Sequence, residues 1–387
     1  MPQIAGFRGA LWDPSKVELA KVAAEPLTHV KERLAKGELV RDATRAMYRY
    51  DQAYDIGGRV LTRTTLVCAI RLEPWNDGLI RPHEQTDSSA RDAAAAMIGE
   101  AGAHCEPVFA GYRDPSREID RLIRNVDRER PVSDVTTPDK TVHKVWRIAS
   151  AELIGKMRPL FAPKKLHVLD GHARYEGMLA YAAKLGADHQ PQYSSANYGL
   201  GCLVNVEDPA LAVAPRHRLV RTDGLKRDAV LEAAKRYFIV DTLVGAARDL
   251  AKQQMALADS VAHQPAFVAT FAGDADAHKL TLKPDISLVG EGVEVHRAIQ
   301  RYEPVVLEHL FLRRVLQTVS TTSTDAMAVL DAVKGGAAVG VIMRPVPLSE
   351  VLHADEVGAL LPFGSTAFHP ALATLFAFVV DPNEDLV

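Results

Sequence analysis

The stretch from Leu166 to Leu185 constrains the fold most, because its pattern changes from strand-like to helix-like at a single glycine. Residues 166–169 form a short apolar run of strand length. After Gly171, apolar residues recur at helical spacing: Tyr175, Met178, Leu179, Ala182 and Leu185. The pattern predicts a strand that turns sharply at Gly171 into a helix, a combination typical of folds that mix sheet and helix.

The predicted turn carries side chains suited to an anion. Asp170 is expected to cap the helix, and His172 and Arg174 fall in its first turn, where backbone N–H groups favour negative charge. A guanidinium matches phosphate oxygens, and a carboxylate oxygen is a ligand that Mg²⁺ prefers. We therefore expect a phosphate or carboxylate site here, with Asp170 as a magnesium ligand. The alternative is a simple helix cap, with Arg174 paired to Glu176 or solvated.

Size and charge set the broad class. The chain of 387 residues is long enough for two domains, and its 47% hydrophobic and 25% charged content is typical of globular proteins. A net charge of −3 argues against a nucleic-acid partner and leaves a homo-oligomer open. Cys68, Cys105 and Cys202 have no zinc spacing and are expected to be reduced. Without a signal-like or bilayer-length apolar run, we expect a cytoplasmic protein with no membrane partner.

The order of predicted elements indicates an α+β fold in two parts. Residues 1–221 mix strands and helices, whereas residues 222–387 contain longer helical stretches and form a second α+β domain. The expected strands are 46–54, 59–72, 106–112, 142–148, 201–206, 266–271 and 336–344. The expected helices are 15–36, 86–102, 114–127, 149–158, 225–237, 243–259, 303–318 and 324–334.

A second candidate segment is residues 82–86, just before an alanine-rich helix. Glu84 could act as a general base, and His83 could orient it or contact phosphate. The alternative is a loop whose Thr86 or Asp87 caps the following helix.

A third segment is Arg216-His217-Arg218, which follows Pro215. Two guanidiniums beside an imidazole suit a polyphosphate. The alternatives are an exposed basic turn or a nucleic-acid contact, although interleaved aromatic residues are missing.

A fourth segment, residues 362–366, places Ser365 and Thr366 after Gly364. Backbone N–H groups in such a turn could surround an anion. The segment lacks the lysine and the second glycine of a P-loop, so an ordinary turn is the alternative.

Taken in order, these segments resemble a bacterial and archaeal family catalogued as domain of unknown function 1015. Residues 169–179 resemble its aspartate-glycine-histidine-histidine-arginine hallmark, and the similarity extends over most of the chain. Further matching segments are 37–42, 48–52, 81–84, 107–109, 143–147, 204–208 and 217–219. The hallmark is also similar to that of free-serine kinases in the ParB and sulfiredoxin superfamily.

This resemblance implies a ParB/sulfiredoxin-like mixed core and a phosphotransferase. The enzyme would move a phosphoryl group from ATP or ADP to the hydroxyl of a free amino acid such as serine. Glu84 would deprotonate the acceptor, while Asp170 would orient it or hold Mg²⁺. His172 and Arg174 would bind the transferring phosphate. Phosphoryl transfer depends mainly on positioning and charge neutralisation, which fits these residues.

The sequence departs from the family at three places. Ala173 stands where the family has its second histidine, and Gly364 stands where it has a lysine. The N-terminal region between Phe7 and Val40 is shortened. These departures support two alternatives: a catalytically impaired nucleotide- or anion-binding regulatory protein, and a ParB-like nucleic-acid-associated protein.

Overall fold

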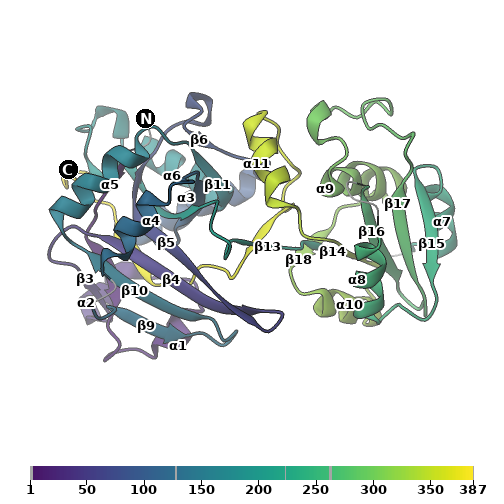
Figure 1. Cartoon of the computed structure of the whole chain (residues 1–387), viewed down its shortest axis with the longest axis horizontal. Helices are drawn as coiled ribbons and strands as arrows, with labels where there is room; N and C mark the ends of the chain where they lie inside the picture. Colours follow the sequence, from purple (N-terminus) through teal and green to yellow (C-terminus); the bar gives the residue numbers. More distant parts are fainter. Residues whose placement is uncertain (1–2, 127–128, 223, 261–263, 387) are drawn as a thin grey trace. The chain divides into compact units, whose positions relative to one another are not determined.

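A computed structural model describes residues 3–126, 129–222, 224–260 and 264–386. The chain forms two compact units (Figure 1). Unit 1 consists of Met1–Pro82, Thr86–Ala212 and Phe368–Val387, and unit 2 consists of His83–Gln85 and Val213–Ala367. The sequence-based division at 221/222 therefore differs from the structure in its boundary. It also differs because the C-terminal segment returns to unit 1.

The C-terminal segment belongs to unit 1 because its strand pairs with strands of that unit. Strand β21 (Phe376–Val379) pairs with β2 (Gly9–Trp12) and with β7 (Ala103–His104). With β3 (Leu39–Arg41), these strands form a four-stranded antiparallel sheet in the order β3-β2-β21-β7. The last strand of the chain therefore completes a sheet that begins near the N-terminus.

The main sheet of unit 1 has nine strands in mixed orientation. Its order is β6-β11-β8-β12-β5-β4-β10-β9, with β1 paired to β5. The parallel pairs are β6 with β11 and β8 with β12. The strands are β1 (Ile4–Ala5), β4 (Met47–Ile56), β5 (Arg59–Arg71), β6 (Ile80–Arg81), β8 (Val108–Tyr112), β9 (Ser133–Thr136), β10 (Val142–Ile148), β11 (Leu166–Asp170) and β12 (Tyr198–Asn205). The expected strands 46–54 and 59–72 correspond to β4 and β5, which pair antiparallel on either side of Gly57-Gly58.

The helices of unit 1 follow the predicted positions with one exception. Residues 15–36 form two short helices, because Pro26 removes a backbone donor between them. The helices are α1 (Leu19–Val22), α2 (Val30–Lys36), α3 (Ser88–Ala101), α4 (Glu118–Ile123), α5 (Ala151–Phe161) and α6 (His172–Lys184). Short 3-10 turns are η1 (Trp75–Asp77), η2 (Arg124–Val126), η3 (Ala187–His189) and η4 (Ser195–Asn197).

Unit 2 is built on a six-stranded antiparallel sheet in the order β15-β17-β16-β19-β14-β18. Its core packs mainly aromatic and branched side chains, among them Phe238, Phe267 and Phe311. The strands are β14 (His217–Val220), β15 (Phe238–Leu243), β16 (Ala266–Phe271), β17 (Ala277–Leu282), β18 (Thr321–Ser323) and β19 (Val339–Ile342). Both units therefore mix helices with sheet, as predicted.

Helices complete unit 2. They are α7 (Arg227–Ala234), α8 (Leu250–Ala258), η5 (Arg297–Ile299), α9 (Glu303–Val306), a π-helix η6 (Leu307–Leu316), α10 (Ala326–Lys334) and α11 (Leu348–Glu356). Strands β13 (Ala212–Ala214) and β20 (Ala367–His369) span two of the four chain boundaries between the units, those at 212/213 and 367/368. None of the described helices combines the length and apolar character that a membrane span requires.

Candidate functional site

The turn at residues 166–174 has the predicted strand–turn–helix form. Strand β11 ends at Asp170, α6 begins at His172, and Gly171 between them has a φ of +93°, which favours glycine. The expected helix cap at Asp170 is wrong. Gly171 occupies the cap position and no side chain caps the helix, because the strand already includes Asp170.

Arg174 lies between two carboxylates in unit 1. Its Nη1 donates to Glu106 Oε2 at 3.0 Å, and its Nη2 donates to Asp170 Oδ2 at 3.1 Å. Its Nε is buried and has no hydrogen-bond partner among the residues that the structure describes. A Cβ atom on Gly171 would lie 2.9 Å from this guanidinium, so glycine also makes room for it. Because both terminal nitrogens of Arg174 already bind carboxylates, an anionic ligand that binds them would displace Glu106 or Asp170. Glu106 was not among the predicted site residues, because no motif in the sequence includes it.

Asp170 and His172 differ in exposure. The Asp170 side chain is 53% exposed, whereas His172 is 8% exposed. In the described part of the chain, no group of three or more His, Cys, Asp or Glu side chains could hold a metal ion. Mg²⁺ is often held by one or two carboxylates plus water and substrate phosphates, so the exposed Asp170 carboxylate fits that kind of site.

Glu84 lies in unit 2, where its segment pairs with residue 361. The Gln85 backbone N–H donates to Leu361 O at 2.9 Å, and the Leu361 N–H donates to His83 O at 2.8 Å. This pairing places the Glu84 carboxylate against residues 362–366. Glu84 Oε2 accepts from the Gly364 N–H at 2.9 Å, and Oε1 accepts from the Thr366 N–H at 2.7 Å and from the Thr366 hydroxyl. Glu84 is thus held by the loop and is 7% exposed.

The loop at 362–366 therefore already surrounds an anion, and that anion belongs to the chain itself. The N–H groups expected to meet a phosphate are those that bind Glu84. The Ser365 hydroxyl donates to Pro362 O at 2.5 Å, and Thr366 Oγ1 lies 2.8 Å from His83 Nε2. Gly364 has a φ of +69°, and a Cβ there would lie 3.1 Å from Thr322 Cγ2. These two constraints give a local reason for glycine where the family has lysine.

Arg216, His217 and Arg218 do not form an exposed basic turn, so that alternative is wrong. His217 and Arg218 belong to β14 and are each 2% exposed. The Arg216 Nε donates to Thr366 O at 2.9 Å, which joins this segment to the loop that holds Glu84. Burial of a strand inside an antiparallel sheet also removes these two side chains from the solvent-facing position that a nucleic-acid contact needs.

Burial shifts the titration of both β14 side chains. It lowers the pKa of Arg218 to about 10, while the nearby carboxylates of Glu308 and Glu84 act in the opposite direction. Burial, together with the Arg218 charge, lowers the pKa of His217 to about 4. The His217 Nδ1 accepts a hydrogen bond from the Met343 N–H at 3.0 Å, which requires a neutral ring. His217 is therefore uncharged at neutral pH.

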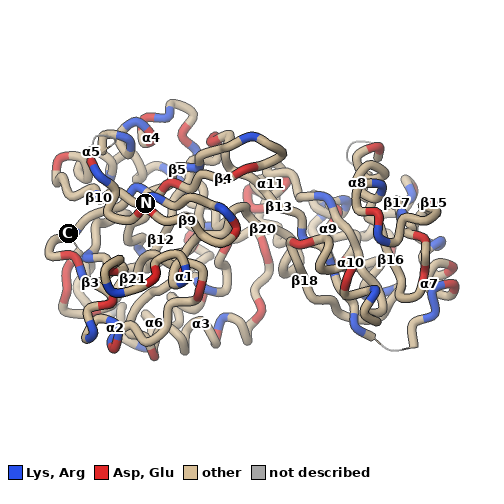
Figure 2. The backbone as a smooth tube through the Cα atoms, turned by 90° about the horizontal axis from the view of Figure 1, so that it is seen from below, with Lys and Arg blue, Asp and Glu red and all other residues tan. Residues whose placement is uncertain are grey.

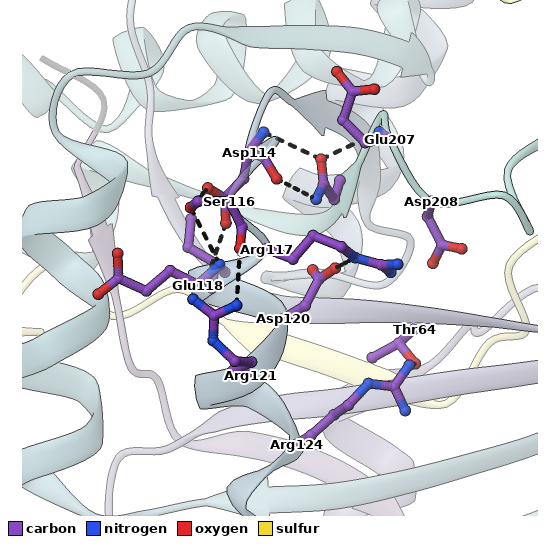
Figure 3. Close-up of polar contacts among 12 residues, drawn as sticks. Thr64, Asp114, Ser116, Arg117, Glu118, Asp120, Arg121, Arg124, Glu207 and Asp208 are labelled. Carbon is purple, nitrogen blue, oxygen red and sulfur yellow. Dashed lines mark hydrogen bonds and ion pairs between the residues drawn. The ribbon is translucent and has the colours of Figure 1, made fainter.

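A separate polar cluster in unit 1 was not anticipated as a site (Figure 3). The Asp114 carboxylate accepts from the Ile119 N–H at 2.9 Å and from the Ser116 hydroxyl at 2.8 Å. The Asn205 amide donates to Asp114 O at 2.9 Å and accepts from the Asp114 N–H at 3.2 Å. Asp114 follows β8 and Asn205 ends β12, two parallel neighbours. The cluster therefore joins the loops at the carboxyl ends of these strands, and a structural role accounts for its contacts.

The strand that carries the hallmark turn has a parallel neighbour in unit 1. Strands β6 and β11 run parallel, with Arg81 opposite His167, and Asp170 follows His167 by three residues. The carboxyl ends of adjacent parallel strands are where ligand sites in mixed folds tend to occur.

Comparison with known families identifies the chain. A family model described as a protein of unknown function, DUF1015, matches residues 6–310. The chain belongs to this family. The resemblance inferred from the hallmark segment is therefore confirmed over most of the sequence. None of the curated proteins compared matches the chain.

Solved structures similar to this DUF1015 protein have low sequence identity. One is a variant of a free serine kinase in complex with ADP, at 12% identity over 75% of this chain and 84% of that chain, with a TM-score of 0.38. Another is a conserved hypothetical protein from Pyrococcus furiosus, at 13% identity over 75% and 87%, with a TM-score of 0.37. A C-terminally truncated SbnI from Staphylococcus aureus has 12% identity over 82% and 90%, with a TM-score of 0.39. The family assignment rests on the sequence match and not on these structural scores.

Proposed function

We propose that this DUF1015 protein is a small-molecule phosphotransferase. It would move a phosphoryl group from ATP or ADP to the hydroxyl of a free amino acid such as serine, with a ParB/sulfiredoxin-like core in unit 1. The observation that carries the proposal is the buried polar network of unit 2. Glu84 is fixed by the 362–366 loop, Arg216 binds the same loop, and the Arg218 charge acts on Glu84. A fixed carboxylate beside guanidiniums supplies a base and positive charge together.

Glu84 is the proposed general base. Two backbone N–H groups and the Thr366 hydroxyl donate to its carboxylate, and charge-assisted hydrogen bonds of this kind stabilise the ionised form. An ionised carboxylate can accept the proton of an acceptor hydroxyl as that oxygen attacks phosphorus. His83 lies 2.8 Å from Thr366 Oγ1 and would position that hydroxyl.

In unit 1, the proposed role of Arg174 and His172 is to bind the transferring phosphate. Arg174 is shared by Asp170 and Glu106, so a phosphate that binds it would displace at least one carboxylate. Displacement of Asp170 would leave its exposed carboxylate available to Mg²⁺. When bound, the ion would neutralise developing charge on the phosphate oxygens.

The test is a transfer assay with variants of one loop. The protein is incubated with Mg²⁺, ATP or ADP and a panel of hydroxyl amino acids, and phosphate transfer is followed by phosphorus NMR. We expect Glu84→Gln to retain nucleotide affinity but to lose turnover by about a hundredfold or more.

Phe363→Ala is the matched control, because the Phe363 side chain belongs to the same loop, is 58% exposed, and can be removed with the Gly364 and Thr366 contacts to Glu84 left in place. It should retain turnover. Absence of transfer to every acceptor, together with absence of nucleotide binding by calorimetry, would overturn the proposal. Equal turnover in Glu84→Gln and wild type would remove Glu84 from the mechanism.

A second candidate function is a catalytically impaired regulatory protein that binds a nucleotide or another anion. Two observations favour it: Ala173 replaces a histidine of the family hallmark, and the loop donors at 364 and 366 are engaged by Glu84. This candidate predicts that ATP or ADP raises the melting temperature without forming a product. Detection of any phosphorylated amino acid would rule it out.

A further inference from the structure

Unit 2 contains a surface cavity of about 410 Å³ next to the segments that hold Glu84. Gln85, which follows Glu84, and Pro362, which begins the loop that binds Glu84, line one part of the cavity. The other lining residues are Val293, Glu294, His309, Arg313 and Arg314. Its volume lies in the range of small-ligand sites, and three of its lining side chains are basic.

The three basic side chains come from one face of the π-helix η6. In a π-helix the backbone bonds join residues five apart, so residues four and five apart lie on the same side. His309, Arg313 and Arg314 have this spacing and all line the cavity. In an ordinary α-helix the third of these residues would be rotated away. Such π-helical segments occur frequently at functional sites.

One of the two guanidiniums retains donors for a ligand. The Arg313 Nε donates to Glu308 Oε1 at 2.8 Å, and its two terminal nitrogens make no hydrogen bond within the described residues. Both terminal nitrogens of Arg314 are engaged by Glu291, because Nη1 donates to Oε2 at 3.0 Å and Nη2 donates to the backbone oxygen at 2.5 Å, so Arg314 contributes its charge. Neither partner carboxylate lines the cavity, where Glu294 is the acidic lining residue. The paired terminal nitrogens of Arg313 match two phosphate oxygens.

The cavity is also connected electrostatically to Glu84. Arg218 is influenced by both Glu84 and Glu308, and Glu308 is the partner of Arg313. A ligand at Arg313 would therefore act on the same network as the proposed base. All of these residues belong to unit 2.

We propose that this cavity binds an anion that carries a diphosphate group, through the Arg313 guanidinium with Arg314 and His309 beside it. The inference goes beyond the proposed function and does not depend on it, because the binding of a diphosphate anion is measurable without phosphoryl transfer. Neither the hallmark segment nor the other sequence motifs include these three residues.

His309 provides an independent readout. Burial lowers its pKa, the Arg313 and Arg314 charges lower it further, and Glu308 acts in the opposite direction. Glu294 lines the same cavity. Because a bound diphosphate is strongly negative, it should raise the pKa of His309 and cause proton uptake. Protonation of His309 should therefore increase the affinity for diphosphate at pH 6. At pH 8 the imidazole stays neutral and should not contribute.

The first experiment is calorimetry on the full chain with inorganic pyrophosphate, ADP and adenosine. Pyrophosphate and ADP should bind, and adenosine should bind at least about tenfold more weakly. Arg313→Gln should weaken pyrophosphate and ADP by about tenfold or more, the usual size of a lost charge-assisted hydrogen bond. Arg236→Gln is the matched control, because Arg236 pairs with the same Glu291 as Arg314 but does not line the cavity.

The second experiment compares wild type with His309→Gln at pH 6 and pH 8. The variant should lose affinity for pyrophosphate at pH 6 and match wild type at pH 8. Equal pyrophosphate affinity in Arg313→Gln and wild type, or adenosine binding as tight as that of ADP, would overturn the inference. Pyrophosphate binding lost in Arg313→Gln without any transfer activity would refute the proposed function alone. Transfer activity with unchanged binding in Arg313→Gln would refute this inference alone.

Discussion

Two carboxylates from the family motifs are held in opposite ways. Glu84 of unit 2 is 7% exposed and accepts from two backbone N–H groups, whereas the Asp170 side chain of unit 1 is 53% exposed and pairs with Arg174. Backbone donors are fixed when the chain folds, but an exposed ion pair can exchange partners. The comparison teaches that the position of Glu84 depends on the folding of unit 2, while Asp170 is free to respond to a ligand. Figure 2 shows acidic and basic residues distributed along both units.

The largest expected effect is the difference in folding stability lost when each of the two carboxylates is removed. Glu84→Ala leaves the buried N–H groups of Gly364 and Thr366 without their acceptor, at a cost of about 2–4 kcal/mol. Asp170→Ala removes a partly exposed ion pair and should cost less than about 1 kcal/mol. A similar loss in both variants would break the comparison.

The measurement has to resolve the units. All three tryptophans, Trp12, Trp75 and Trp146, belong to unit 1, so tryptophan fluorescence reports on that unit. Unit 2 is better followed by hydrogen exchange of the β14 and β19 amides during urea denaturation. Glu84→Ala should accelerate exchange in unit 2, and Asp170→Ala should leave it unchanged.

A somewhat smaller effect is expected from acid. His217 in unit 2 has its pKa lowered from 6.5 to about 4, so the folded state binds this proton less readily than the unfolded state. The contribution of neutral His217 to the free energy of unfolding is therefore complete above pH 6.5. It is lost as the pH falls toward 4, by up to about 3 kcal/mol. Hydrogen exchange of β14 should accelerate over this window in wild type. His217→Gln should show a shallower dependence on pH, and an unchanged slope would contradict the assignment.

The smallest effect tests the geometry around Glu84. Gly364 and Gly358 have nearly equal φ values, +69° and +68°, so alanine suffers the same backbone strain at either position. A Cβ at Gly364 would lie 3.1 Å from Thr322 Cγ2, whereas a Cβ at Gly358 would contact nothing within 4 Å. Gly364→Ala should therefore be less stable than Gly358→Ala by about 1 kcal/mol in urea denaturation. Equal stabilities would mean that this contact does not shape the loop.

Local patterns in the sequence predicted much of unit 1. The turn at Gly171 and the strands at 46–54 and 59–72 depend on residues that are close in the chain, so local periodicity and glycine placement were sufficient. The alternative of an exposed basic turn at residues 216–218 was wrong for the opposite reason. Strand β14 is buried by pairing with β18 and β19, which lie far along the chain and leave no local signal.

The candidate residues were easier to predict than their contacts. Glu84, Arg216 and Thr366 carry recognisable chemistry, but only the fold brings residue 84 to the loop at 364–366. The basic face of η6 was missed because its spacing is regular only in a π-helix, and sequence periodicity is normally interpreted with α-helical spacing.

Strand β21 has a consequence for how the protein is made. It lies between β2 and β7 in the four-stranded sheet, yet the ribosome synthesises it only after all of Val213–Ala367 has emerged. At typical translation rates of about 5–20 residues per second, the edges of β2 and β7 that pair with β21 remain unpaired for tens of seconds. During this interval unit 2 can form its own antiparallel sheet, while the four-stranded sheet of unit 1 still lacks one of its two inner strands. A gene divided after residue 212 would therefore encode two fragments that do not match the two units. The first would carry His83–Gln85 of unit 2, and the second would carry Phe368–Val387 of unit 1.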